Sequence, residues 1–493
     1  MIAQETITQT GAVVLNWIGG EWVGSDKIVE SINPATYEVI GAYADGGLDV
    51  AKAGIAAAKK AFAQTPWKRD RRLRAKVLNQ LADAYERHRD ELIDLVALEN
   101  GKIKPEAAFE VDMVPAKLRY AASLVRTDYG RAMEPKPGSL SIVLREAIGV
   151  AGVIVPWNSP VVLMIRSLAP ALTAGCTAVI KMPHQSAQVG GFIARIMAEA
   201  TDLPPGVINL FNESTSIGSR HIIDSPDVPT ISFTGSTATG RSISATGAQN
   251  LKRFGLELGG KTPMILFDDA DLDLAIPKVQ QALTVFAGQF CMTGSRLLVQ
   301  RGVADAVRQK LAARLDSLKV GPASDSSSEM GPIIDKPNVE RINKMVEEAI
   351  DAGAKVIVRG GPIMDGPLAN GAFYRPTMLE VTDANIDIVQ KEVFGPVVTM
   401  HVFDTEAEAI SLANNSEYGL CASIWTPNLN RSMRVAQAIE VGTIWFNDWA
   451  VIYDEFEEGG YKQSGVHRMN GMAALDDFLE YKHITFSPGM VTG

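Results

Sequence analysis

A single cysteine, Cys291, lies in a stretch whose neighbours suit chemistry at its sulfur. Residues 285–296 read VFAGQFCMTGSR, and Gln289 and the small residues leave room for a ligand to approach the thiol. Upstream, Glu257 stands between two leucines and ahead of a Gly-Gly pair. If the two stretches face each other, the chain pairs a thiol nucleophile with a base in a largely apolar setting. The alternative is a buried structural cysteine, which is a common role for this residue.

A second candidate is a turn between a strand and a helix that would suit a phosphate group. Gly235, Ser236 and Thr237 follow the β-branched strand Thr230–Thr234 and open a helix. Free backbone N–H groups and the helix dipole favour an anion there, and glycine allows close approach. An ordinary tight turn would show the same pattern. Lys181, at the end of an earlier strand, would lie along the same sheet edge, as a ribose-phosphate contact or as a solvated strand end.

Asn158 is a third candidate because its position would hold a side-chain amide at that edge. It stands in the sequence PWNSP, after Trp157 and before Ser159, at the carboxyl end of an expected strand. Ligands bind at this edge in open α/β sheets. Near a nucleophilic cysteine the amide would stabilise a tetrahedral oxyanion. The alternative is an asparagine that only forms a turn.

Two regions of alternating strands and helices must position these residues. The first is expected to hold strands over 148–155, 177–181, 207–211 and 230–234, and helices over 160–174 and 185–200. The second begins near residue 264, with strands over 298–299, 356–358, 397–403, 424–425 and 442–447, and helices over 304–318, 339–352 and 406–414. Before both come a hairpin over 16–25 and helices over 48–64, 71–87, 90–99 and 105–127. Such alternation predicts an α/β fold with helices on both faces of a parallel sheet.

Composition and charge exclude several classes of function. A chain of 493 residues is too long for one core and predicts two or three domains. The net charge of −10, without a basic run, predicts no nucleic-acid partner. No apolar run reaches the roughly 20 residues that span a bilayer, and the N-terminus shows no secretory signal, so we expect no membrane partner. Cys176, Cys291 and Cys421 lie far apart without metal-ligand spacing, which favours a cytoplasmic protein and predicts no metal site.

Six motifs, in order, make the chain similar to the aldehyde dehydrogenase superfamily. They are PWNSP, FTGSTATG, LELGGK, GQFC, KEVFGP and the stretch around Asn447. The interval of 34 residues between Glu257 and Cys291 also matches, and the resemblance covers nearly the whole chain. It implies a Rossmann-like parallel-sheet cofactor domain (1–124 and 148–258), an α/β catalytic domain (259–470) and a small β oligomerisation extension (125–147 and 471–493).

The resemblance also implies a mechanism that these residue types support. Cys291, as a thiolate, would attack the aldehyde carbon. Asn158 and the backbone N–H of Cys291 would hold the oxyanion, and hydride would pass to the nicotinamide of NAD(P). Glu257 would activate water to hydrolyse the thioester, and its flanking leucines predict a raised pKa through desolvation.

The cofactor residues that the resemblance implies are Trp157, Lys181, His184, Gly235, Ser236, Leu258, Glu392 and Phe394. Family members often carry glutamate where this chain has His184. A carboxylate holds the ribose hydroxyls of NAD and repels a 2′-phosphate, whereas histidine does neither reliably. NAD is therefore the expected cofactor, and NADP stays open as an alternative.

At the substrate, the resemblance implies Ser159, Arg166, Phe290 and Met292. Many members have an aromatic residue in place of Ser159 and a Trp-Lys pair in place of Arg166 and Ser167. An arginine eight residues beyond the asparagine would lie on the same general helix face and bind a carboxylate. An acid semialdehyde is therefore an attractive substrate, and the alternative is an ion pair of Arg166 within the protein.

The acidic loop, residues 454–458 (DEFEE), is a departure that bears on this choice. It puts four acids where many relatives have Pro-Phe before a Gly-Gly pair, near the substrate entrance in the family. It would be a solvated loop, the partner of Arg166, or a filter against anions. The sequence leaves these three interpretations open.

Two other functions compete with hydrolytic aldehyde oxidation. A CoA-acylating relative would pass the acyl group to CoA, but members of that type tend to lack the base that Glu257 provides. A structural relative without catalysis would have lost at least one of Cys291, Glu257, Asn158 and Glu392, and all four are retained.

Two segments resemble the oligomerisation elements of the family. They are residues 135–145, which read as a strand, and the tail 481–490. Neither would bury its apolar face within one subunit, so we expect a homodimer or a homotetramer.

Overall fold

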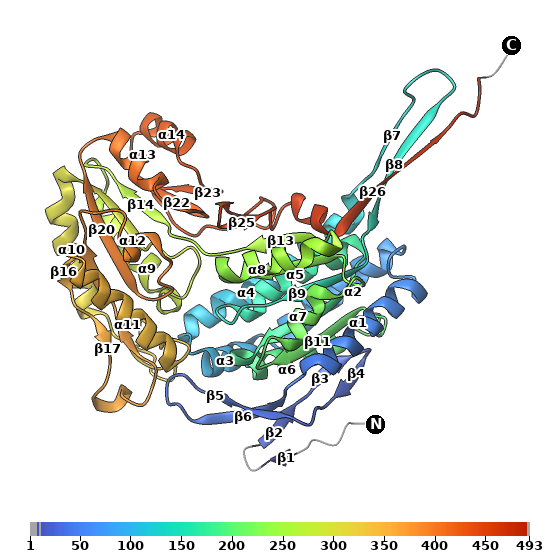
Figure 1. Cartoon of the computed structure of the whole chain (residues 1–493), viewed down its shortest axis with the longest axis horizontal. Helices are drawn as coiled ribbons and strands as arrows, with labels where there is room; N and C mark the ends of the chain where they lie inside the picture. The colour runs from blue at the N-terminus through green and yellow to red at the C-terminus, as the bar shows by residue number, and fades with distance from the viewer. Residues whose placement is uncertain (1–6, 9–10, 491–493) are drawn as a thin grey trace.

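The computed structural model describes residues 7–8 and 11–490, and the ends of the domains expected at 1 and 493 lie outside this range. Its main body holds two sheets, with helices packed on both (Figure 1). The first sheet has, in spatial order, β25 (Gly465–Val466), β13 (Arg253–Glu257), β12 (Thr230–Thr234), β9 (Val150–Ile154), β10 (Thr177–Pro183), β11 (Ile208–Glu213), β3 (Asn16–Ile18) and β4 (Glu21–Val23). The five strands from β13 to β11 are parallel, which confirms the expected α/β class.

Helices cover both faces of this sheet because its strands are buried on both sides. One face packs against α1 (Gly47–Gln64), α7 (Ile217–Asp224) and α8 (Thr237–Gly247). The other packs against α2 (Arg71–Arg87), α3 (Arg89–Asn100), α4 (Lys104–Thr127), α5 (Pro160–Ala174) and α6 (Ala187–Ala198). The hairpin and the helices expected before residue 128 are therefore confirmed within a few residues.

The second sheet contains the strands expected after residue 264. In spatial order they are β16 (Lys355–Val358), β19 (Thr377–Glu380), β20 (Val397–Phe403), β15 (Arg296–Gln300), β14 (Pro263–Leu266), β22 (Cys421–Trp425) and β23 (Thr443–Phe446). Only the edge pair β16 and β19 is antiparallel. The helices of this region are α9 (Leu272–Thr284), α10 (Ala304–Ser317), α11 (Lys336–Asp351), α12 (Asp387–Gln390), α13 (Glu406–Asn414) and α14 (Leu429–Ala438).

A three-stranded antiparallel sheet projects away from this body (Figure 1). It consists of β26 (Leu479–Phe486), β8 (Leu140–Ala147) and β7 (Arg131–Met133). The strand expected over 135–145 therefore begins later, because a turn occupies residues 135–139. All of β26 beyond Leu479 is exposed in the single subunit.

A small sheet near the N-terminus was not predicted. It pairs β1 (Ile7–Thr8), β2 (Gly11–Val14), β6 (Val39–Ala44) and β5 (Ile28–Ile32). Shorter strand pairs join β17 (Gly361–Pro362) to β18 (Tyr374–Arg375) and β21 (Tyr418–Gly419) to β24 (Tyr461–Lys462).

Candidate active site

Glu257 is the last residue of β13, at the carboxyl edge of the first sheet. Its neighbours across the strands are Thr234 of β12 and Gly465 of β25. The residue is 4% exposed and its Oε1 has no hydrogen-bond partner. Burial raises the pKa of this carboxyl to about 8, with Arg166 lowering it and Glu458 raising it further. The side chain is therefore a base that titrates near neutral pH, as the flanking leucines predicted.

The loop that carries Cys291 is held in an unusual backbone conformation. Phe286 and Ala287 have φ of 52° and 53°, a region that is costly for residues with a Cβ. Gln289 is buried, its Oε1 accepts from the Ile334 backbone N–H at 2.8 Å and its Nε2 donates to the Phe286 carbonyl at 3.0 Å. The Gln289 amide thus fixes the loop at both of its polar atoms, a role that the sequence did not predict.

The Gly-Gly turn after Glu257 packs directly on this loop. A Cβ at Gly260 would lie 2.2 Å from the Cys291 carbonyl oxygen, so only glycine allows the approach. The structure thus brings the glutamate and cysteine stretches together. The cysteine is half-buried, and burial raises the pKa of its thiol well above the usual range, although Arg166 lowers it. An isolated thiolate would be unstable here, so a nearby base is needed to form one.

Asn158 reaches the same loop from the other side. It lies between β9 and α5 and is buried, and its Nδ2 donates to the Gln289 carbonyl at 3.0 Å. A residue that only formed a turn would bond to its own neighbours, whereas this bond spans the two regions. The second N–H of the amide stays available for an oxyanion.

A buried charge pair behind the start of α5 was not predicted. The Lys102 ammonium pairs with Glu110 and also donates to the Ser159 Oγ at 2.9 Å. Glu110 in turn accepts from the Val161 backbone N–H at 2.8 Å, at the N-terminus of α5. This network fixes the end of the helix that presents Asn158. Its members are distant in sequence, and no motif marks them.

A cavity beside the thiol collects all four residues expected at the substrate. It is lined by α4, α5, the cysteine loop and the acidic loop, and its lining includes Cys291, Ser159, Arg166, Phe290, Met292 and Glu458. The indole of Trp449 supports this lining, because its Nε1 donates to the Met292 carbonyl at 2.8 Å and its ring contacts Phe290 edge to face.

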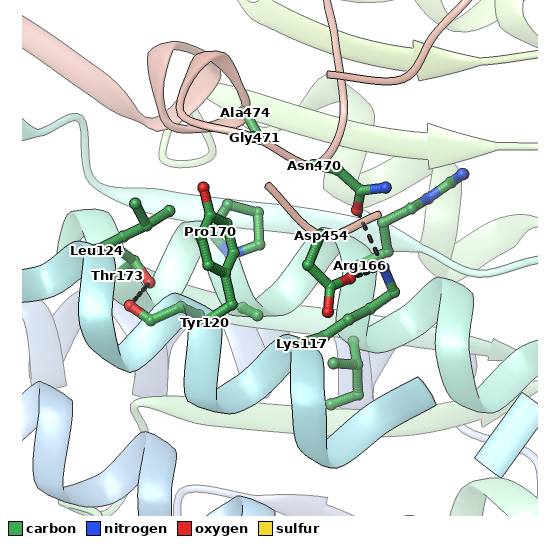
Figure 2. A pocket seen from close by; sticks show the side chains of 13 residues that line it. Lys117, Tyr120, Leu124, Arg166, Pro170, Thr173, Asp454, Asn470, Gly471 and Ala474 are labelled. Atoms are coloured by element: carbon green, nitrogen blue, oxygen red, sulfur yellow. Dashed lines mark hydrogen bonds and ion pairs between the residues drawn. The ribbon is translucent and has the colours of Figure 1, made fainter. Parts of the chain in front are cut away.

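The acidic loop is tied to α4 and α5 by two basic residues. Arg166 Nη1 lies 3.8 Å from Glu458 Oε2, and its Nη2 donates to Thr234 Oγ1 at 3.2 Å. Lys117 donates to Asp454 at 2.5 Å and to the Asn470 side chain at 3.1 Å, at the wall of a second pocket (Figure 2). Of the three interpretations of this loop, the partner of Arg166 is the one that the geometry supports.

Most of the residues expected at the cofactor gather at one edge of the first sheet. Trp157, Lys181, Gly235 and Leu258 each lie at or just beyond the carboxyl end of a strand, and β10, β9, β12 and β13 are neighbours in that order. The Lys181 ammonium is largely desolvated, and this burial lowers its pKa despite the acidic Glu213. This is the edge at which parallel sheets bind ligands.

Two residues at this edge already have structural partners. The Ser236 Oγ caps α8 by accepting from the Thr239 backbone N–H at 3.2 Å. The Gly235 N–H donates to the Glu257 carbonyl at 3.0 Å. His184, which begins a short 3₁₀ turn, is exposed. The free N–H groups at the start of α8 remain the anion-binding feature.

Glu392 and Phe394 approach the same edge from the second region. Glu392 Oε1 accepts from the Gly260 backbone N–H at 3.0 Å, and burial raises the pKa of this carboxyl to about 7. The Phe394 ring contacts the Trp157 ring edge to face, with centroids 5.4 Å apart. The two residues thus lie between the cysteine loop and the sheet edge.

Residues 7–8 and 11–490 contain neither a membrane-spanning helix nor a cluster of metal ligands. No helix in that range is long and apolar enough to cross a bilayer. The same residues contain no group of three His, Cys, Asp or Glu side chains arranged to hold a metal ion.

Comparison with known proteins identifies the family. The sequence pattern described as "Aldehyde dehydrogenase family" matches residues 22–484. The chain belongs to the aldehyde dehydrogenase family. This aldehyde dehydrogenase is 37% identical over 473 residues to betaine aldehyde dehydrogenase of Bacillus subtilis, an alignment that covers 95% of this chain and 96% of the relative. It is 35% identical over 472 residues to mitochondrial succinate-semialdehyde dehydrogenase of Arabidopsis thaliana, and this alignment covers 95% of this chain and 88% of the relative.

Solved structures agree with the fold of this aldehyde dehydrogenase. The crystal structure of Staphylococcus aureus betaine aldehyde dehydrogenase in complex with NAD⁺ matches with a TM-score of 0.94 at 36% identity, covering 97% of this chain and 96% of the other. Another structure of that protein contains NAD⁺ and a cysteine modified by β-mercaptoethanol. The resemblance that the six motifs implied is confirmed.

Proposed function

We propose that this enzyme oxidises an aldehyde to a carboxylic acid, with NAD as cofactor, through a thiohemiacetal and a thioester on Cys291. The observation that supports the proposal is the close approach of the Gly260 turn to the Cys291 carbonyl, which brings the glutamate and cysteine stretches together. A base, a nucleophile and an amide donor are the components that acyl transfer needs. Glu257 and Asn158 supply the base and the donor.

The residues act in sequence on the carbonyl carbon. Glu257 takes the proton of the Cys291 thiol, and the thiolate adds to the aldehyde carbon to form a thiohemiacetal. Its oxyanion is held by the free N–H of Asn158 and the backbone N–H of Cys291. Loss of hydride restores the carbonyl as a thioester. Glu257 then releases this proton to solvent and takes a proton from a water that attacks the thioester. The tetrahedral adduct collapses, the acid leaves, and the departing thiolate takes the proton from Glu257, which regenerates the thiol.

The residues at the sheet edge fit NAD. The free N–H groups at the start of α8 suit the pyrophosphate, and the desolvated Lys181 suits a ribose or phosphate oxygen. Glu392 and Phe394 lie where they would hold the nicotinamide side, with Trp157 and Leu258 as apolar walls. NAD supplies the hydride acceptor. His184 carries no negative charge that would repel a 2′-phosphate, so NADP stays as a second candidate.

These roles divide the chain into three parts. We assign 1–124 and 148–258 to cofactor binding and 259–470 to catalysis. Segments 125–147 and 471–493 are assigned to oligomerisation. The approach of Gly260 to the cysteine loop lies at the junction of the first two. Hydrolysis is favoured over transfer to CoA because the base is present at the thiol.

The identity of the aldehyde depends on Ser159, Arg166, Phe290 and Met292, which line the cavity together. The hypothesis of an acid semialdehyde depends on Arg166 as an anion receptor. The charge of Arg166 already has Glu458 as a partner at 3.8 Å, and an acid substrate would compete with that carboxylate. Oxidation of succinic semialdehyde relative to an uncharged aldehyde of equal length tests this hypothesis.

We infer a homodimer or homotetramer from the projecting sheet. Its strand β26 exposes Ile484 and Phe486, and Met133 of β7 is exposed as well. Such apolar side chains are stabilised by burial against another subunit. Sedimentation equilibrium tests the oligomeric state, and a monomer at micromolar concentration would contradict the inference.

We place the enzyme in the cytoplasm because Cys176, Cys291 and Cys421 are all free.

The central experiment replaces the nucleophile. Cys291→Ala is expected to abolish NADH formation from aldehydes while cofactor binding stays measurable by fluorescence quenching. Cys176→Ala is the matched control, because that thiol is buried against the Phe478 carbonyl, away from the cavity. Undiminished turnover in Cys291→Ala would refute the proposed function.

A further inference from the structure

Arg166 and Glu458 form an incomplete ion pair in the wall of the Cys291 cavity. They are 7% and 5% exposed, and both line the cavity. Their nearest charged atoms, Nη1 and Oε2, are 3.8 Å apart, which is beyond a hydrogen bond. The other contacts are with neutral groups: Nη2 donates to Thr234 Oγ1, and Oε2 accepts from the Asn470 Nδ2 at 2.9 Å.

One atom on each side chain remains without a hydrogen bond. Arg166 Nε and Glu458 Oε1 are both buried and have no partner. A buried donor or acceptor left unpaired is costly, so such atoms mark a place where a ligand group completes the network. Both side chains line the cavity, so this unpaired donor and acceptor lie in its wall.

The charges around the pair select against an ionic group. The other charged residues of the cavity wall are Lys117 and Glu110, and each has its own partner, Asp454 and Lys102 respectively. The wall is therefore electrically balanced. A substrate carboxylate would meet Glu458 without a free cation, and a substrate ammonium would meet Arg166 without a free anion. An uncharged group that both donates and accepts satisfies the two atoms at once.

The second pocket does not account for these atoms. It shares Arg166 with the Cys291 cavity, but Glu458 lines only the latter. Figure 2 shows the guanidinium pointing away from the end of the second pocket that holds Tyr120 and Thr173. Of these two cavities, the Cys291 cavity is therefore the one that has both side chains in its wall.

We infer that Arg166 and Glu458 are specificity-determining residues that bind an alcohol group of the substrate, so that the enzyme prefers hydroxyaldehydes. The hydroxyl oxygen accepts from Arg166 Nε and its hydrogen is donated to Glu458 Oε1. This inference rests on the proposed aldehyde oxidation and names the class of its substrate. Aldehydes without the hydroxyl leave both buried atoms unpaired and lose binding in the transition state.

A panel of four short aldehydes tests the inference on the unmodified enzyme. Butanal, 3-hydroxybutanal, succinic semialdehyde and betaine aldehyde present an apolar, a hydroxyl, an anionic and a cationic group. We expect kcat/KM for 3-hydroxybutanal to exceed that for each of the others by about tenfold or more. A ratio near one against butanal, or a higher value for either charged aldehyde, would overturn the inference while leaving aldehyde oxidation intact. Failure of all four to give NADH would overturn the proposed function and the inference with it.

Variants locate the preference on the two residues. Glu458→Leu and Arg166→Met are expected to bring the ratio of 3-hydroxybutanal to butanal close to one, whereas Glu458→Gln, which keeps an acceptor, retains part of it. Glu455→Leu is the matched control, since that residue lies on the same loop but is exposed, and it should keep the unmodified ratio. A full preference in Glu458→Leu would contradict the assignment. Should these variants fail to fold, the panel on the unmodified enzyme still decides.

Discussion

The burial of Glu257 predicts that thioester hydrolysis accelerates with pH through about 8. Only the carboxylate form can take a proton from water, and burial raises the pKa of this group to about 8. Roughly a tenth of the enzyme then has the base ionised at pH 7, and roughly nine tenths at pH 9. The hydrolysis rate should therefore rise about tenfold between these pH values. A carboxyl with its ordinary pKa of 4.5 would be fully ionised throughout and give a flat profile.

Charge substitutions near the base should move this profile in opposite directions. Glu458 raises the pKa of Glu257, so Glu458→Gln is expected to shift the midpoint to lower pH. Arg166 lowers it, so Arg166→Met is expected to shift the midpoint to higher pH. Glu99→Gln is a matched control, because Glu99 is also a buried carboxyl whose pKa is raised to about 7, but it binds the start of α6. It should leave the midpoint unchanged.

Stopped-flow measurement of NADH separates the steps. At saturating aldehyde and NAD, a burst reports formation of the thioester, and the steady phase that follows reports its hydrolysis. Both phases are recorded from pH 6 to 9.5 at constant ionic strength. Glu257→Gln should slow the burst, because the thiol then lacks its base, and should also give a slow steady phase without the rise. A steady phase that stays flat from pH 6 to 9 in the unmodified enzyme would refute the reasoning.

Three further predictions concern single residues. Asn158→Ala should lower kcat by about 10²-fold through loss of an oxyanion donor, with cofactor affinity unchanged in a binding titration; an unaltered kcat would remove the residue from this role. His184→Glu should increase the ratio of kcat/KM for NAD to that for NADP, because a carboxylate repels the 2′-phosphate; a constant ratio would show that position 184 does not face the ribose. Lys102→Met should reduce the free energy of unfolding in urea by about 3 kcal/mol, because it leaves Glu110 buried without its cation. Lys104→Met, which removes an exposed ion pair, should reduce it by less than about 1 kcal/mol. Equal reductions in the two variants would contradict this account.

Much of the fold was predictable because local patterns follow burial. The long helix Gly47–Gln64 and the strand Thr230–Thr234 carry strong periodic or β-branched signals, and both were placed within a residue. Strand Arg253–Glu257 was not recognised as a strand, because its five residues contain a charged start and a glycine. Its extended form is stabilised by pairing with β12 and β25, which are far from each other in the chain. The small N-terminal sheet also escaped prediction, since strand Ile28–Ile32 is mostly exposed.

The sequence by itself determined the class of reaction. Cys291, Glu257 and Asn158 are the residue types that acyl transfer requires, and each stands in one of the six short motifs that make the chain similar to the aldehyde dehydrogenases. Those features are local, so they can be recognised without knowing which segments meet.

Only the tertiary structure decided what surrounds these residues. Lys117 and Asp454 are 337 positions apart, and no periodicity or motif relates them, yet they meet in the folded chain. The same holds for Arg166 and Glu458, whose open pairing leaves a donor and an acceptor in the cavity. Desolvation likewise depends on the packing of both sheets, and it raises the pKa of Glu257. Hydrogen bonding and desolvation act over a few ångströms in space, whereas the sequence records only distance along the chain.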